Sequence, residues 1–112
     1  MAAVLDAGPA AGLAYSSALA WWGLRGFDLV PAHVVRPHGP GGSTDHLGRV
    51  HQSRVLPASH VVTYRSIPVT TPARALLEVA GAIHPGRLER VLESAWAERL
   101  VTYRSLAEEL QT

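Results

Sequence analysis

The sequence predicts an α+β fold: an N-terminal helix, a small, mainly antiparallel sheet of three to four strands, and three C-terminal helices. Strand-like segments follow one another between residues 29 and 70 and do not alternate with helices, which favours α+β over an alternating α/β fold. From residue 71 onward, the spacing of apolar residues changes from two to about 3.6, the period of a helix. A chain of 112 residues has the usual length of one domain, so we expect residues 1–112 to form a single unit.

The first helix is predicted over residues 14–24, because apolar residues follow helical spacing there and Gly23 favours a helix end. Residues 1–13 are rich in Ala and Gly without such spacing, so we expect disorder and no regular element in them. Trp21 and Trp22 cannot both face the core, since neighbouring side chains on a helix point about 100° apart. One is expected in the core. For the other, Trp21, contact with a partner and packing on a neighbouring strand are equal alternatives.

The middle of the chain is predicted to be extended. β-branched residues are frequent there, and clusters of Gly, Pro and Ser separate the segments. In chain order we expect a strand over residues 29–36, a loop over 37–45, a strand over 47–55, a turn over 56–59, a strand over 60–65 and a further extended segment over 66–70.

A sharp helix start is predicted at Thr71 and Pro72, because Thr is a favoured N-cap and Pro a favoured first helical residue. This helix is expected to end at a break over residues 81–86, and the next one to span about residues 85–99. Thr102 is the predicted N-cap of the last helix. The residues expected on one face are Ala73, Leu76, Leu77 and Ala80 in the first of these helices, Leu88, Val91, Leu92, Ala95, Trp96 and Arg99 in the second, and Tyr103, Leu106 and Leu110 in the third.

Arg74 is unexpected in the first turn of a helix, where the helix dipole disfavours a cation. A capping box would have Glu or Gln at this position. Glu78 follows four residues later, but an Arg that precedes a Glu is the weaker orientation of such a pair. Since local helix energetics do not account for Arg74, we expect its side chain to reach a strand carbonyl or a carboxylate of another element. An outside partner is the alternative.

The composition excludes several kinds of chemistry. The chain has no cysteine, so it can form neither a disulfide nor a thiolate metal site. All ten basic residues are arginines, which excludes a Schiff-base lysine, a phosphate-loop lysine and a nuclease motif that ends in lysine. The net charge of +1 is too small to indicate nucleic-acid binding by itself.

No catalytic or metal-binding constellation stands out, and we expect no catalytic residue, no metal and no cofactor. Glu89 and Glu93 share a helix face, but a solvated helix surface explains them better than a catalytic pair. The remaining pairs are histidines five residues apart, which on strands or loops do not share a face and therefore make poor metal sites. These are His33 with His38 and His46 with His51.

A strip of basic residues lies on or beside the predicted strands. It consists of Arg36, Arg49, His51, Arg54 and Arg65. Arg49 and His51 should share one face of their strand and Arg54 should lie on the other, because side chains alternate with a period of two. The strip predicts a surface that contacts an acidic partner or the phosphates of a nucleic acid. The favoured alternative is a sheet edge that charge keeps from aggregating.

No apolar run approaches the ~20 residues of a membrane span. The start of the chain is apolar but contains Asp6 and has no basic residue before it, which is not typical of a signal peptide. We therefore expect a cytoplasmic protein that does not contact a membrane.

The region from Gly48 to Leu110 resembles actinobacterial proteins related to the abortive-infection antitoxin AbiEi. Four stretches carry the resemblance: "VHQSRVLP", "IPVTTPARALLEVA" and "LERVLESAWAERLVTYRSL" within that region, and "SSALAWWGLRGF" before it. With the upstream helix, the resemblance covers about nine tenths of the chain. The junction "PVTTPAR", which contains Thr71, Pro72 and Arg74, is its most specific part.

The resemblance implies the central, antitoxin-type domain of such proteins. In that family a winged helix-turn-helix that binds its own operator usually precedes this domain, and many related proteins continue into a very-short-patch-repair-like endonuclease. We expect neither neighbour here. The 13 residues before the first helix are too few for a winged helix-turn-helix, and a chain without lysine cannot hold the acidic-x-lysine nuclease motif.

We therefore expect a non-enzymatic, antitoxin-like or regulator-associated domain that acts by protein–protein contact. The resemblance implies a nucleotidyltransferase-like toxin as its partner in a type IV toxin–antitoxin system, or a role as a regulator. Two alternatives stay open. One is a nucleic-acid-binding module that uses the basic strip. The other is the non-catalytic N-terminal portion of a very-short-patch-repair-like endonuclease, whose nuclease domain would then be the missing partner.

Overall fold

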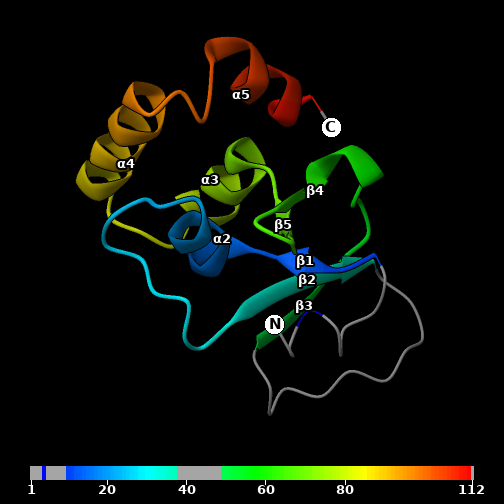
Figure 1. The fold of residues 1–112 in the computed structure, drawn as a ribbon. Coiled ribbons are helices and arrows are strands. Elements are labelled where there is room, and N and C mark those ends of the chain that lie inside the picture. Colours follow the sequence, from blue (N-terminus) through cyan, green and yellow to red (C-terminus); the bar gives the residue numbers. More distant parts are fainter. Residues whose placement is uncertain (1–3, 5–9, 38–48, 112) are drawn as a thin grey trace.

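The computed structural model describes Val4, residues 10–37 and residues 49–111, and in this part of the chain five strands form one sheet (Figure 1). The strands are β1 (Gly12–Leu13), β2 (His33–Pro37), β3 (Arg49–Ser53), β4 (Val61–Tyr64) and β5 (Ile67–Thr70). Their order across the sheet is β3-β2-β1-β5-β4. The α+β class is confirmed, since helices and a sheet occupy separate parts of the molecule.

The prediction of three to four mainly antiparallel strands is wrong, because the sheet is mixed. β1 pairs antiparallel with β2 and β4 with β5, whereas β2 pairs parallel with β3 and β1 parallel with β5. Parallel neighbours need a long connection rather than a tight turn. In the sequence, 11 residues separate the end of β2 from the start of β3. The predicted loop over residues 37–45 lies outside the described residues except for Pro37, which ends β2.

β1 corrects the expectation that residues 1–13 contain no regular element. This two-residue strand lies at the centre of the sheet, between β2 and β5, and both of its residues are buried. A Cβ atom on Gly12 would lie 2.9 Å from Cγ1 of Val61 and 3.3 Å from the backbone nitrogen of Val69. Glycine is therefore required at this position, because only glycine lets the neighbouring chain come so close.

We expect Gly12→Ala to lower the free energy of unfolding by about 1–3 kcal/mol, the usual cost of overpacking an interior. Urea denaturation followed by circular dichroism would measure the loss. Gly81→Ala is the matched control, because no atom lies within 4 Å of the Cβ it would add. If the two variants are equally stable, the contact around Gly12 relaxes at no cost and the interpretation is wrong.

Four α-helices lie outside the sheet in the described part of the chain: α2 (Tyr15–Trp21), α3 (Pro72–Ala80), α4 (Pro85–Ala97) and α5 (Tyr103–Leu110). A short 3₁₀ helix, η2 (Ala58–His60), lies between β3 and β4. Helix α3 contacts α2, α4 and α5, and Figure 1 shows α4 and α5 beyond α3, away from β2 and β3. The longest of these helices, α4, has 13 residues, and none in the described part combines the length and apolarity needed to cross a bilayer.

The predicted helix starts are confirmed. The Thr71 side chain accepts a hydrogen bond from the backbone nitrogen of Arg74, and Pro72 is the first residue of α3. Thr102 caps α5 in a reciprocal capping box with Ser105. Helix α2 is shorter than the predicted 14–24. It ends at Trp21, and the chain leaves the helix through Gly23, whose φ of 92° lies in the left-handed region.

The core lies between the sheet and helices α2 and α3. Its largest fully buried apolar side chains are those of Leu13, Leu19, Val34, Val69 and Leu76. Helix α3 buries two of the four residues expected on one face, Ala73 and Leu76, whereas Leu77 and Ala80 are only partly buried. Its buried residues are Ala73, Ala75, Leu76 and Val79. This wider face follows from the position of α3, which other helices cover on several sides.

Helices α4 and α5 bury less than their apolar patterns predicted. In α4 the buried residues are Val91 and Ala95, while the side chain of Trp96 is 53% exposed. In α5 no residue is buried, and Tyr103 and Leu110 are 78% and 72% exposed. Both helices lie at the outside of the fold, where a helix buries only a narrow stripe.

Candidate functional site

Arg74 lies at the centre of a hydrogen-bond network and binds partners inside the fold. Its guanidinium donates from Nη1 to the carbonyl of Val55 (3.0 Å), from Nη2 to Oγ of Ser53 (3.2 Å) and from Nε to Oε2 of Glu78 (3.2 Å). The side chains of Arg74 and Glu78 are only 13% and 9% exposed. The network thus ties the first turn of α3 to the chain that leaves β3. The carbonyl it reaches lies just beyond that strand, and the carboxylate belongs to Glu78 of the same helix, not to another element as expected.

Glu78 extends this network to α2. Its Oε1 accepts a hydrogen bond of 3.0 Å from the backbone nitrogen of Tyr15. Tyr15 begins α2 with a φ of 54°, a left-handed conformation that costs a non-glycine residue energy. Burial raises the pKa of Glu78, although the hydrogen bond from Tyr15 and the charge of Arg74 both act to lower it. Oε1 of Glu78 therefore links α3 to the start of α2, while Oε2 binds Arg74 of the same helix.

His60 connects the same network to α5. Its Nδ1 lies 2.9 Å from Nη1 of Arg74 and 3.1 Å from Oε2 of Glu109. One ring nitrogen cannot accept from the arginine and donate to the carboxylate at the same time, so these contacts are alternatives that depend on the proton of His60. We call Ser53, Val55, His60, Arg74, Glu78 and Glu109 the Arg74 network. It joins α3, α5, η2 and the end of β3.

A second polar group lies between β2, β3 and α2. Nδ1 of His33 and Nε2 of His51 are 3.1 Å apart, and the ring of Tyr15 lies 4.2 Å from that of His51, measured between centroids. In the parallel pairing His51 lies opposite Val35, two residues after His33, so both histidines project from the same face of the sheet. Burial and the positive charge of Arg49 lower the pKa of His33, and burial together with the charge of Glu78 raises the pKa of Tyr15.

This histidine pair differs from both pairs considered for metal binding. Of the histidines in those pairs, His38 and His46 lie outside the described residues. The structure brings together His33 and His51 instead, two residues on neighbouring strands that are 18 positions apart in the sequence. In the described part of the chain, no group of three or more His, Asp or Glu side chains is arranged to hold a metal ion.

We expect His33 to make the stability of the protein depend on pH. Its pKa is below 6.5 in the folded state, so the unfolded state binds more protons as the pH falls through 6.5. The stability that depends on neutral His33 is therefore complete above that value and is lost as the pH falls toward the folded pKa. Urea denaturation at about pH 8 and about pH 5 should show a smaller loss for His33→Gln than for the wild type. Equal losses would contradict this assignment.

Trp21, the last residue of α2, and Trp22, its C-cap, both pack on the β4–β5 hairpin. Nε1 of Trp21 donates to the carbonyl of Tyr64 (2.7 Å), and Nε1 of Trp22 donates to the carbonyl of Thr70 (2.9 Å). The rings of Trp22 and Tyr64 stack with centroids 4.4 Å apart. Of the two alternatives for Trp21, the structure therefore shows the contact with a neighbouring strand.

The structure does not bring the basic strip together. Arg36 is only 8% exposed, so the expectation that it contributes to a basic surface is corrected. Arg49 and Arg54 are exposed at β3 and beside its end, whereas Arg65 is exposed in the β4–β5 turn, with its guanidinium 5.3 Å from the ring centroid of Tyr64. β3 and β4 are opposite edges of the sheet, four strand spacings or about 19 Å apart.

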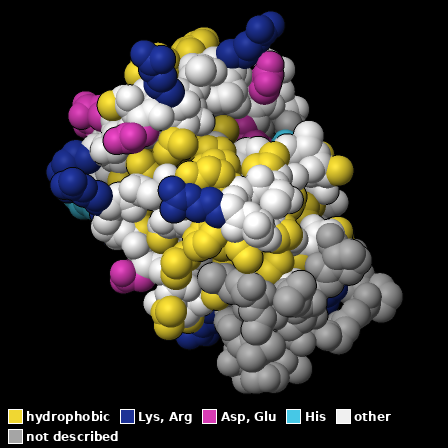
Figure 2. All heavy atoms as spheres, in the orientation of Figure 1, with side chains coloured by type: hydrophobic (Ala, Val, Ile, Leu, Met, Phe, Trp, Pro, Cys, Tyr) yellow, Lys and Arg dark blue, Asp and Glu magenta, His cyan; other side chains and the backbone are white. Residues whose placement is uncertain are grey.

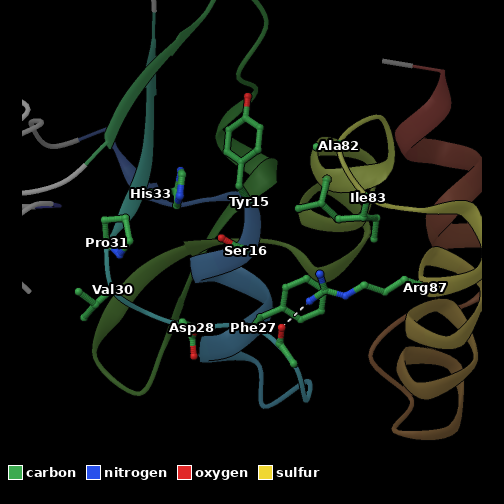
Figure 3. Close-up of a pocket in the computed structure, with 12 residues that line it drawn as sticks. Tyr15, Ser16, Phe27, Asp28, Val30, Pro31, His33, Ala82, Ile83 and Arg87 are labelled. Atoms are coloured by element: carbon green, nitrogen blue, oxygen red, sulfur yellow. Dashed lines mark hydrogen bonds between the residues drawn. The ribbon is translucent and has the colours of Figure 1, made fainter.

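A pocket of about 370 Å³ lies beside the histidine pair (Figure 3). Its wall comes from the start of α2, the segment before β2, β2 itself, and the end of α3 with the start of α4. The lining residues are Tyr15, Ser16, Gly26, Phe27, Asp28, Val30, Pro31, His33, Val79, Ala82, Ile83 and Arg87. The sequence contains no signal for this pocket, because its walls come from segments that are distant in the chain and mostly apolar. Among the described residues that line this pocket, no hydroxyl group is hydrogen-bonded to a side chain that could act as its base.

Comparisons with protein-family models, with curated proteins and with solved structures find no match to this chain.

Proposed function

We propose that this chain is a non-enzymatic, antitoxin-like domain that acts by protein–protein contact. The Arg74 network supports this proposal. Its two carboxylates and its histidine could act as acid and base in a hydrolase. Here Glu78 binds Arg74, and His60 lies within bonding distance of Arg74 and Glu109, so these groups join elements of the fold. The resemblance of the junction around Thr71 and Pro72 to AbiEi-related proteins points to the same class.

The observation that carries the proposal is the exposure of Trp96. This large apolar side chain is 53% exposed and borders a hollow of about 350 Å³ whose other walls are Leu92, Glu93 and Ala97. We call these four residues the α4 surface. Tryptophan is the side chain most enriched in the energetic centres of protein interfaces, and it binds best where a pocket surrounds it. An exposed tryptophan beside a hollow therefore suits a partner that inserts an apolar group.

The residue types of the α4 surface also indicate which chemical groups the partner should present. Its only charged member is Glu93, so the matching surface should present an apolar group with a basic side chain beside it. The resemblance to AbiEi-related proteins implies a nucleotidyltransferase-like toxin as that partner, with inhibition by direct contact. A regulator that carries this domain would use the same surface.

We expect Trp96→Ala to weaken binding to the product of the neighbouring gene by about thirtyfold or more, equal to ~2 kcal/mol for the loss of an interface centre. The proteins would be co-expressed and their affinity measured by biolayer interferometry. Tyr103→Ala is the matched control, because it removes an exposed aromatic ring, 78% exposed, that lies outside the α4 surface. Its affinity should match that of the wild type.

Two results would count against the proposal. If the wild-type chain neither binds the neighbouring gene product nor rescues growth of cells that express it, the antitoxin-like function is contradicted. If binding occurs but Trp96→Ala and Tyr103→Ala weaken it equally, the contact lies elsewhere and the α4 surface is the wrong assignment.

A further inference from the structure

Three arginines line one small hollow beside α4. The hollow has a volume of about 220 Å³, and its walls are the side chains of Arg25, Arg87, Arg90 and Ser94, with Leu24 and Val91 behind them. No Asp or Glu belongs to this wall. We call it the arginine hollow. Three like charges around so small a space repel one another, and a bound anion would remove that repulsion.

The arginines of this hollow have no carboxylate partner in the part of the chain that the structure describes. Within the described residues, none of Arg25, Arg87 and Arg90 forms an ion pair, in contrast to Arg74 and Arg104. Arg87 donates from Nη2 to the carbonyl of Gly26, which uses one of the five donors of a guanidinium. The planar guanidinium fork matches the oxygens of a phosphate, and Ser94 adds a hydroxyl donor.

Arg87 also forms part of the wall of the larger, 370 Å³ pocket. Its guanidinium carbon lies 4.7 Å from the ring centroid of Phe27, and Figure 3 shows the two side chains together at one side of that pocket. The arginine hollow and the larger pocket are therefore neighbours that share one side chain. A single ligand could occupy both if it joined an anionic group to a less polar one.

The larger pocket suits a flat ring. Figure 3 shows Val30, Pro31 and His33 on one side and Ala82 and Ile83 on the other. Most of this wall is apolar, which favours a ring that is itself mostly apolar. Ser16, Asp28 and His33 add a few groups that can form hydrogen bonds with polar atoms on the edge of a ring. Figure 2 shows hydrophobic side chains across the middle of the face on which α2 lies in Figure 1.

We propose that the arginine hollow and the larger pocket together bind a small molecule in which a flat, mostly apolar ring is joined to a phosphate. Nucleoside monophosphates belong to this class. The phosphate contacts Arg25, Arg87 and Arg90, and the ring lies between Pro31 and Ile83. This site is separate from the α4 surface, so it stands or falls independently of the proposed protein partner.

Isothermal titration calorimetry with AMP, adenosine and inorganic phosphate tests the proposal on the full chain. AMP should bind at least about tenfold more tightly than either of its parts, since each part fills only one of the two spaces. The double variant Arg25→Ala/Arg90→Ala should lower the affinity for AMP at least about tenfold, because it removes two charge-assisted contacts to the phosphate. Both side chains are exposed, so the fold should not change. The matched control is Arg54→Ala/Arg104→Ala, which removes two exposed arginines elsewhere.

A second variant tests the ring pocket without removing charge. Ala82 is exposed and lines the larger pocket, so the indole of Ala82→Trp should fill that pocket. The variant should then bind AMP no more tightly than inorganic phosphate. Ala58→Trp, at an exposed position that lines neither space, is its control. Absence of AMP binding at millimolar concentration overturns the proposal. So does AMP binding that Arg25→Ala/Arg90→Ala and Ala82→Trp leave unchanged.

Discussion

Arg74→Ala is expected to lower the free energy of unfolding by about 3–5 kcal/mol, the usual cost of removing one partner of a buried ion pair. Glu78, with its side chain 9% exposed, would lose its cationic neighbour while staying buried. Ser53 and Val55 would lose their hydrogen bonds from the guanidinium. Urea denaturation monitored by tryptophan fluorescence measures the effect, because Trp21 and Trp22 pack on the fold that would be lost.

Two further variants separate the charge from the geometry of Arg74. Arg74→Lys keeps the charge but not the planar fork that reaches Ser53, Val55 and Glu78 together, so it should recover only part of the stability. The double variant Arg74→Met/Glu78→Gln should be more stable than Arg74→Ala, because it leaves no uncompensated buried charge. A loss of less than about 1 kcal/mol for Arg74→Ala would show that the network contributes little, by the scale that applies to exposed ion pairs.

Leu76→Ala is expected to cost about 2–5 kcal/mol, the range measured when a large buried side chain is truncated and a cavity remains. The side chain of Leu76 is only 1% exposed and belongs to the core cluster, on a helix that contacts α2, α4 and α5. Leu77→Ala is the internal control. It removes the same atoms from the next position, which is only partly buried, so it should cost clearly less.

The comparison of these two leucines is most informative if made in one series of urea unfolding curves. Equal costs would mean that the two positions are equally well packed, which contradicts the buried face found for α3. A cost below about 1 kcal/mol for Leu76→Ala would show that α3 is not packed as the structure describes.

Helix starts were the most predictable elements of this fold. Thr71 and Pro72 define the start of α3, and Thr102 that of α5, because capping depends on residues that are adjacent in the chain. The continuity of α3 over residues 72–80 could likewise be predicted without knowledge of the fold, because no helix-breaking residue follows Pro72 in that range. Such signals can be read from a sequence because the atoms that interact are only a few residues apart.

The sheet was less predictable, because tertiary packing determines which strands lie next to one another. β1 has only two residues, too few to show an alternating pattern, yet it holds the centre of the sheet. Gly12 is required there by the closeness of Val61, a residue in a different part of the chain. The exposure of Trp96 could not be read from its helical spacing either, since the spacing says which side chains share a face and not which face is covered.

For the candidate sites too, local interactions could be predicted from the sequence and contacts between distant segments could not. The sequence alone was enough to exclude thiol and lysine chemistry, and it showed that α3 does not explain Arg74, since both inferences need only composition and local helix energetics. The partners of Arg74, the contact between His33 and His51, and the meeting of Arg25, Arg87 and Arg90 depend on the folded chain. Each of these groups includes residues from segments distant in sequence, and burial of the shared core, rather than any local preference, brings those segments together.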